Sequence, residues 1–221
     1  MTLHYGRVAG QSLERLAALS DGIFAVAMTL LALDLRVPAH DAALQLGAAF
    51  IWTPGALQAE ISVWNLLAPL WPRFLTYLMS FLTLGIFWLG QQAQLATFER
   101  GSRGLAWVHI AFLCAVTLMP FSTSFLAEYI GSRLAIGVYW LNLLLLGVML
   151  FASLTYGERT GLLKESATDE LRALHKRRIV VYQSLYAVCF GLGAINPYLG
   201  IVLLILAQIV SLLPRLSARP N

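Results

Sequence analysis

Asp21 is the residue of this sequence most able to do chemistry, because it lies inside an apolar segment at about residues 16–35. A charge inside a bilayer costs several kcal/mol unless it is paired or hydrated, so such a residue usually marks a functional site. Arg15 lies six residues earlier, about 9 Å along a helix axis, and is a candidate counter-charge. Ser20 adds a hydroxyl beside the carboxylate. These residues predict a functional site built on one membrane helix.

The same segment has one apolar face when it is drawn as a helix. The residues that point within roughly 60° of Val26 include a single hydroxyl, and they are Leu19, Gly22, Thr29, Leu30 and Leu33. Asp21 points about 140° away from Val26, and Ser20 about 120° away on the other side. If the face lines a pore, its narrowest ring is apolar and gates by dewetting or by width. Otherwise it is ordinary packing surface, and periodicity alone leaves both alternatives open.

Enzymatic and metal chemistry lack the motifs they need. The four histidines show no metal-ligand spacing, and the sequence has neither a His-Glu-x-x-His motif nor a glycine-rich phosphate loop. Ser20 and Asp21 are adjacent and point about 100° apart on a helix, so they do not form a nucleophile and base pair. We therefore expect no enzyme, no cofactor and no resident metal.

Long uncharged runs indicate the elements that carry these residues. Apolar residues make up 59% of the 221 residues and charged residues 12%, whereas soluble domains carry about 25% charged residues. Uncharged runs of 25, 24, 24 and 36 residues follow Arg73, Arg103, Arg133 and Arg178. A helix crosses the bilayer with about 20 residues, so the longest run fits two spans that turn at residues 191–197.

We therefore predict an all-α integral membrane protein with six transmembrane helices in a single domain over residues 1–221. The expected spans are about 16–35, 74–94, 104–126, 134–156, 178–194 and 197–214. An outer connection over 37–72 joins the first two, and Asp41 is the expected N-cap of a short helix within it. Pro120 is expected near the outer end of the third span.

The distribution of basic residues predicts the orientation. The two termini and the connections at 95–104 and 157–178 together hold 12 of the 15 Lys and Arg residues. The positive-inside rule places these segments, and so the N- and C-termini, on the cytoplasmic side of the cell (inner) membrane. The basic cluster at 174–178 is interpreted as an anchor attracted to anionic lipid. The expected environment is the lipid bilayer, with no nucleic-acid partner.

Three blocks of sequence stand in an order that is typical of one known family. The first block is Arg15, three further residues, Leu19-Ser20-Asp21 and an apolar stretch that ends in Asp34-Leu35. The second runs over residues 70–88 and the third over residues 107–129. Together they resemble the transmembrane protein 175 family of potassium channels, in its prokaryotic single-repeat form. The last three spans match that family only in hydropathy.

The resemblance implies a potassium-permeable cation channel in which the first helix of each subunit lines a central pore in a homotetramer. The ligands it implies are permeating K⁺ and other monovalent cations. It places an apolar constriction on positions that the helical projection also selected: Val26, Thr29, Leu30 and Leu33. It further implies a hydrogen-bond network that holds the pore helix, formed by Arg15, Ser20, Asp21, Trp88 and His109.

The sequence departs from the family pattern at several of these positions. Leu19 stands where Phe is usual, Gln91-Gln92 replaces a histidine pair, and His109 replaces an Asn. We interpret Gln91 and Gln92 as interfacial residues at the cytoplasmic end of the second span. Val26 is smaller than the Ile or Leu expected at the first ring, which predicts a wider ring and weaker potassium selectivity.

Alternatives remain at the level of function and of single charges. The main alternative function is a proton- or cation-coupled secondary transporter that uses Asp21, and a purely structural assembly protein is another. Asp34, at the outer end of the first span, either contributes to a ring of carboxylates at the outer mouth or pairs with Arg36. Glu128 is expected to pair with Arg133 at the outer rim.

Overall fold

The computed structural model describes residues 12–36, 52 and 56–212. Within these ranges the regular elements are helices, apart from one isolated bridge between Phe98 and Leu163. The helices are α2 (Leu13–Leu33), α3 (Ala56–Leu67), the 3₁₀ turn η1 (Ala68–Leu70), α4 (Trp71–Leu95), α5 (Arg103–Thr117), α6 (Met119–Glu128), α7 (Arg133–Arg159), α8 (Asp169–Ile195) and α9 (Pro197–Leu212).

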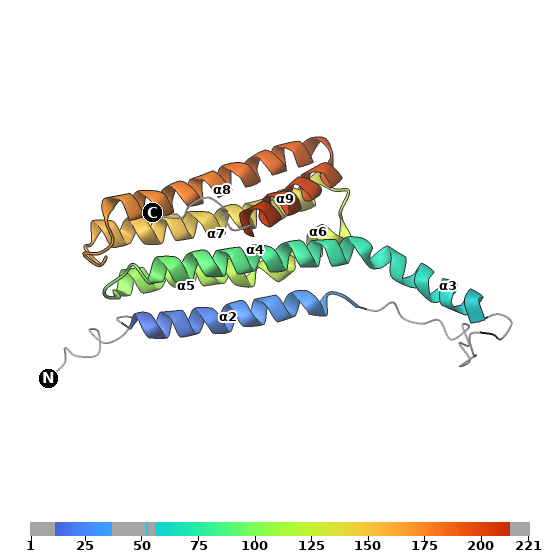
Figure 1. Cartoon of the computed structure of the whole chain (residues 1–221), viewed down its shortest axis with the longest axis horizontal. Helices are drawn as coiled ribbons and strands as arrows, with labels where there is room; N and C mark the ends of the chain where they lie inside the picture. The colour runs from blue at the N-terminus through green and yellow to red at the C-terminus, as the bar shows by residue number, and fades with distance from the viewer. Residues whose placement is uncertain (1–11, 37–51, 53–55, 213–221) are drawn as a thin grey trace, which may run out of the picture.

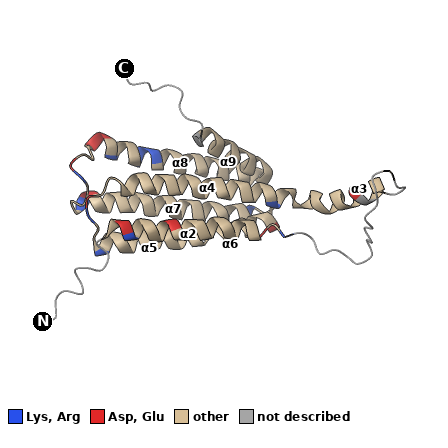
Figure 2. Ribbon diagram, turned by 60° about the horizontal axis from the view of Figure 1, so that its bottom comes forward, with Lys and Arg blue, Asp and Glu red and all other residues tan. Residues whose placement is uncertain are grey.

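The helices run side by side in an elongated bundle (Figure 1). Five helical segments among the described residues are long and apolar enough to cross a membrane, and α9 is a shorter apolar helix. An all-helical bundle is suited to the bilayer, because a helix satisfies its own backbone hydrogen bonds where no water is present. Charged residues gather mainly at the end where α2 and α8 begin (Figure 2). The protein is thus an all-α, multi-pass membrane protein.

The helices extend beyond several of the spans expected from hydropathy. α8 begins at Asp169, whereas the expected span begins at residue 178. Its first turn is favoured because the Thr168 hydroxyl accepts a hydrogen bond from the Leu171 N–H and because Asp169 and Glu170 face the positive end of the helix dipole. Hydropathy marks where the bilayer lies and not where the helix begins. Residues 213 and 214 of the last expected span lie outside the described residues.

The outer connection expected over 37–72 contains helical structure where it is described. α3 passes through η1 directly into α4, and together they extend past the end of the bundle (Figure 1). Pro69 and Pro72 do not interrupt this path, since each lies in the first turn of its helix, where a missing N–H costs little. The helix expected to begin at Asp41 falls outside the described residues.

The third membrane segment is broken in its interior. α5 ends at Thr117 and α6 begins at Met119, within a segment that runs from Arg103 to Glu128. Pro120, which was expected near the outer end of this span, lies at the start of α6, and the break has 15 residues of α5 before it and 10 residues of α6 after it. The helix breaks before Pro120 because this residue has no N–H to donate and because its ring displaces the carbonyl one turn earlier.

The centre of the bundle combines an apolar core with a buried polar chain. α7 packs against α5, α6 and α8, while α4 packs against α2, α6 and α9. Hydrogen bonds run from Thr123 to Ser80, from Ser80 to the Tyr139 hydroxyl and from there to Thr83, at 2.7, 3.2 and 3.3 Å. Thr83 also accepts a hydrogen bond from Gln208 of α9. This chain of hydrogen bonds fixes α4 against α6, α7 and α9.

Glu128 has a different partner from the one expected. Its carboxylate pairs with Arg73 of α4 at 2.5 Å, whereas Arg133 donates from Nε to the Ala194 carbonyl at 2.7 Å. The expected pair with Arg133 is therefore wrong. The actual pair connects the start of α4 with the end of α6, two elements that packing brings together although 55 positions separate the residues.

Candidate functional site: the first membrane helix and its polar contacts

Ser20 forms a buried polar contact between three helices. Its hydroxyl donates to the Leu16 carbonyl of the same helix at 2.8 Å. His109 Nε2 of α5 lies 2.6 Å from the same oxygen, and Gln91 Nε2 of α4 donates to it at 3.1 Å. A hydroxyl has one proton and two lone pairs, so both lone pairs are used if His109 carries its proton on Nε2. Ser20 thereby joins α2 to both α4 and α5.

Asp21 forms a separate contact with α4. Its Oδ1 accepts hydrogen bonds from the Trp88 indole N–H at 2.8 Å and from the Gln92 amide at 2.6 Å. The carboxylate remains exposed on the surface of the chain. Adjacent helix residues point about 100° apart, which is why Ser20 and Asp21 reach different groups.

The face of α4 that meets α2 follows from helical spacing. Trp88, Gln91 and Gln92 stand at positions i, i+3 and i+4, which lie on one side of a helix. The interpretation of Gln91 and Gln92 as interfacial residues does not describe their surroundings, since Gln91 is buried and both bond to α2. The sequence signal that could have indicated this is the spacing of Gln91 and Gln92 from Trp88, which was already expected to belong to the hydrogen-bond network of the pore helix.

Two residues expected at the site lie apart from these contacts. Arg15 is exposed, and its backbone N–H donates to the Ser12 cap at 3.3 Å. Among the described residues, the ion pairs include neither Arg15 nor Asp34. Asp34 caps the end of α2, and its backbone carbonyl accepts from the Arg36 N–H at 2.9 Å. Within one chain, α2 is thus held through Ser20 and Asp21.

The opposite side of α2 is apolar and uncovered by the chain itself. We call Val26, Thr29, Leu30 and Leu33 the outward face of α2; Val26 is 57% exposed and Leu33 is 69% exposed. The Thr29 hydroxyl on this face donates to the Val26 carbonyl at 2.8 Å. A shallow apolar groove beside it reaches Thr117 of α5 and includes Gly22, where an added Cβ would meet nothing within 4 Å.

This arrangement positions a helix and does not assemble reactive groups. No group of three or more His, Cys, Asp or Glu residues in the described ranges could hold a metal ion. The Ser20 hydroxyl is committed to a backbone carbonyl, and the Asp21 carboxylate is committed to two N–H donors. The polar contacts orient α2 so that its outward face is presented away from the bundle.

Comparison with known proteins shows which family the chain is similar to. Residues 15–120 match the family described as endosomal/lysosomal potassium channel TMEM175. A potassium channel of Streptomyces collinus is 32% identical over 187 residues, which is 82% of each chain. A potassium channel of Chamaesiphon minutus is 30% identical over 200 residues, covering 85% of this chain and 87% of the relative.

A solved structure shares the fold as well. The crystal structure of a lysosomal potassium-selective channel TMEM175 homolog from Chamaesiphon minutus superposes with a TM-score of 0.70 at 25% identity. The match covers 90% of this chain and 95% of that chain. The family match over residues 15–120 includes most of α2 together with α4 and α5, the helices that hold it. On the identity and coverage of these relatives, the chain belongs to the TMEM175 family, a family of potassium channels and not of enzymes.

Proposed function

We propose that four copies of this chain assemble around a central pore lined by α2 and conduct potassium ions across the membrane. The relatives are described as potassium channels, and the similar solved structure is described as potassium-selective. Both termini are proposed to lie in the cytoplasm, because the basic residues concentrate on that side of the bundle.

The exposed polar groups of α2 carry this proposal. Asp21 and Thr29 are exposed on a helix that is long and apolar enough to span the membrane. A carboxylate facing hydrocarbon is costly, so the exposed Asp21 is better suited to a place beside protein or water than beside lipid. Asp21 points away from Val26, so it supports the placement of α2 inside an oligomer and is not itself part of the outward face. Small residues on the same helix, including the exposed Gly22 and Ala25, permit close approach of another helix. Other copies of α2 supply that neighbour in a symmetric oligomer.

The outward face of α2 supplies the constriction in this proposal. Four copies of Val26, Leu30 and Leu33 form apolar rings, which resist ion passage by dewetting when they are narrow. Thr29 adds four hydroxyls between these rings. Asp34, at the outer end of α2, adds four carboxylates that concentrate cations at the pore mouth.

The proposal is tested by currents through the purified protein in planar bilayers. We expect ohmic single-channel currents. With potassium on one side of the bilayer and sodium on the other, their reversal potential is expected to follow the potassium gradient. Saturable flux coupled to a second ion would instead support a secondary transporter that uses Asp21. A silent bilayer with intact protein would support a structural role. A purely monomeric protein would overturn the pore.

Substitutions on the outward face of α2 test which residues form the constriction. Leu33→Ser is expected to raise single-channel conductance about two- to fivefold, because the substitution lowers the dewetting barrier. A reduction of that barrier by less than about 1.4 kcal/mol raises a rate less than tenfold. Thr29→Ala is expected to change the ratio of potassium to sodium permeability. Val202→Ala on α9, another exposed apolar position, is the control. If both pore variants retain their oligomer and conduct like the parent, the pore face is wrong.

A further inference from the structure

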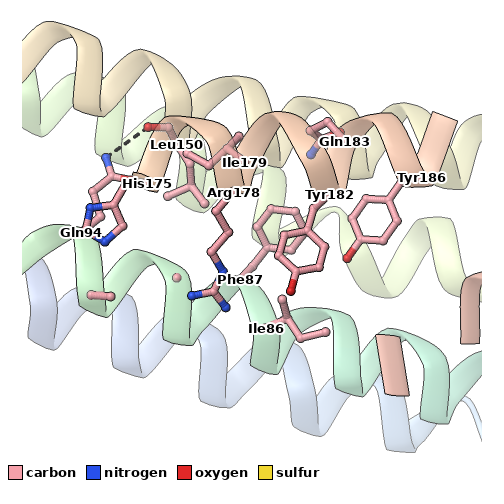
Figure 3. Close-up of a pocket in the computed structure, with 12 residues that line it drawn as sticks. Ile86, Phe87, Gln94, Leu150, His175, Arg178, Ile179, Tyr182, Gln183 and Tyr186 are labelled. Carbon is pink, nitrogen blue, oxygen red and sulfur yellow. Dashed lines mark hydrogen bonds between the residues drawn. The ribbon is translucent and has the colours of Figure 1, made fainter. Parts of the chain in front are cut away.

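Residues of α4 and α8 line a crevice (Figure 3), which lies on the side of α4 away from α2, as the positions of the helices in Figure 1 show. α4 contributes Phe87 and Gly90, α7 contributes Leu150, and α8 contributes residues from His175 to Tyr186. Its empty volume is about 580 Å³, part of which is open to the surroundings. Gly90 helps to keep it open, since an added Cβ there would meet nothing within 4 Å. The crevice lies apart from the proposed pore, and its exposure to lipid rests on the proposed function.

One end of the crevice is cationic and the other is aromatic. His175 and Arg178 lie toward the beginning of α8, while Tyr182 and Tyr186 lie further along the same helix (Figure 3). No Asp or Glu is among the residues that line it. The neighbouring Lys176 is paired with Glu158 and points elsewhere. The charge of the crevice therefore favours an anion at one end and an apolar group at the other.

Unsatisfied polar atoms mark the same place. Arg178 lies 5.7 Å from the centre of the Tyr182 ring, and none of the ion pairs among the described residues includes it. His175 Nδ1 is buried without a hydrogen-bond partner, whereas the Gln183 amide donates to the Leu143 carbonyl of α7. Buried polar atoms in native proteins are nearly always paired, so a bound group that offers hydrogen bonds is expected here.

The length of the crevice matches one leaflet of a bilayer. From His175 to Tyr186 the helix rises about 16 Å, at about 1.5 Å per residue. Half of a hydrocarbon core of roughly 30 Å is about 15 Å. The cationic end lies at the end of the bundle where charged residues gather (Figure 2), which is the level of lipid headgroups. The aromatic end lies at the depth of acyl chains.

We propose that this crevice is a binding site for one phospholipid with an anionic headgroup. The phosphate accepts hydrogen bonds from the Arg178 guanidinium, whose planar fork suits phosphate oxygens, and from the His175 ring. An acyl chain lies between α4 and α8 against Phe87, Tyr182 and Tyr186. Lipid is the occupant because the crevice opens on a helix that faces the bilayer when α2 faces the oligomer axis.

The proposal is tested by native mass spectrometry of the full-length protein titrated with dioleoyl phosphatidylglycerol or dioleoyl phosphatidylcholine. The parent is expected to retain the phosphatidylglycerol preferentially. Arg178→Gln is expected to weaken that binding about tenfold, the loss that corresponds to one charge-assisted hydrogen bond. Arg177→Gln is the matched control, because Arg177 is adjacent and exposed but does not line the crevice. It is expected to weaken binding less than about twofold.

A second variant tests the acyl chain. Gly90→Leu places a side chain in the open space at this position and is expected to reduce lipid retention without disturbing the oligomer. Inorganic phosphate at millimolar concentration is expected not to displace the lipid. Equal losses for Arg177→Gln and Arg178→Gln would overturn the site in favour of diffuse surface attraction. Unchanged binding in Gly90→Leu, or displacement by inorganic phosphate, would also overturn it.

Discussion

At the scale of single residues, two neighbouring side chains of α2 do different work. Ser20 is buried and joins α2 to His109 of α5 and Gln91 of α4, whereas Asp21 is exposed and accepts from Trp88 and Gln92. The helix is therefore fixed both in rotation and in height by contacts about 100° apart on its surface. This is the physical basis for presenting one chosen face outward.

The Asp21 contact is expected to matter for assembly more than for ion selection. Asp21→Ala leaves the Trp88 N–H and the Gln92 amide without their acceptor, which costs about 1–3 kcal/mol. Thermal unfolding and size-exclusion chromatography in detergent measure the loss. Combining Asp21→Ala with Trp88→Phe should cost less than the sum of the two single changes, since both remove the same bond.

The matched control for this cycle is Trp107→Phe, which changes an exposed tryptophan of α5. It is expected to leave both unfolding and assembly unchanged. Normal assembly of Asp21→Ala with altered ion preference would contradict the assignment, because it would place the carboxylate in the ion path.

The Ser20 contact predicts an unequal pair of effects. His109→Leu removes a ring that lies 2.6 Å from the buried Ser20 oxygen and is expected to destabilise the protein by about 1–3 kcal/mol. Gln91→Leu removes one donor to Ser20 together with a buried carbonyl oxygen that has no partner, so its cost is expected to be smaller. Melting temperatures of the two variants check this order, and a larger loss for Gln91→Leu would refute it.

At the scale of elements, the glycines between the last two helices serve packing and not the turn. The chain turns within the expected segment 191–197, at Asn196, because α8 continues to Ile195 and α9 begins at Pro197. A Cβ on Gly200 would lie 2.6 Å from the Gly193 Cα and 3.0 Å from the Cys189 carbonyl oxygen. α8 and α9 therefore meet backbone to backbone, as small residues allow in membranes.

This contact predicts opposite outcomes for two glycine substitutions. Gly200→Ala forces the two backbones apart and is expected to destabilise the protein by about 1–3 kcal/mol. Gly191→Ala on α8 meets nothing within 4 Å and is expected to be neutral or slightly stabilising, since alanine favours helix. Thermal unfolding of both variants in detergent provides the comparison. Equal stability would show that α9 is not held by this contact.

At the scale of the whole molecule, the bundle has two unlike edges. α2 forms one edge and carries the exposed Asp21 and Thr29 within its membrane segment, while α8 and α9 form the other edge (Figures 1 and 2). The buried chain from Thr123 to Gln208 fixes α4 between these edges. In the proposed tetramer, the edge formed by α2 meets other subunits and the edge formed by α8 and α9 meets lipid.

The proposed orientation predicts which loops a membrane-impermeant maleimide reaches. On a background with Cys114 and Cys189 replaced by alanine, Ser132→Cys between α6 and α7 is expected to react in intact cells. Glu165→Cys between α7 and α8 is expected to react only after the membrane is opened, because the basic connections lie inside. The reverse pattern would invert the topology and leave the helix count unchanged.

Much of the fold and part of the site followed from the sequence alone. Long apolar runs between charges predicted the membrane helices, because hydropathy is a local property that each segment carries by itself. Helical periodicity also separated Asp21 and Ser20 from the face containing Val26, since the 3.6-residue repeat fixes directions within one helix. The choice of Trp88 and His109 as partners came from the family resemblance.

Only the tertiary structure decided which groups meet. Asp21 bonds to Gln92 and Trp88 and not to Arg15, and Glu128 pairs with Arg73 and not with the nearby Arg133. The break before Pro120 and the crevice beside Gly90 were equally beyond the pattern of apolar residues. The reason is that such contacts depend on the rotation and offset of packed helices, and interactions between distant segments set both. Spacing along one segment fixes only which side chains share a face of that segment.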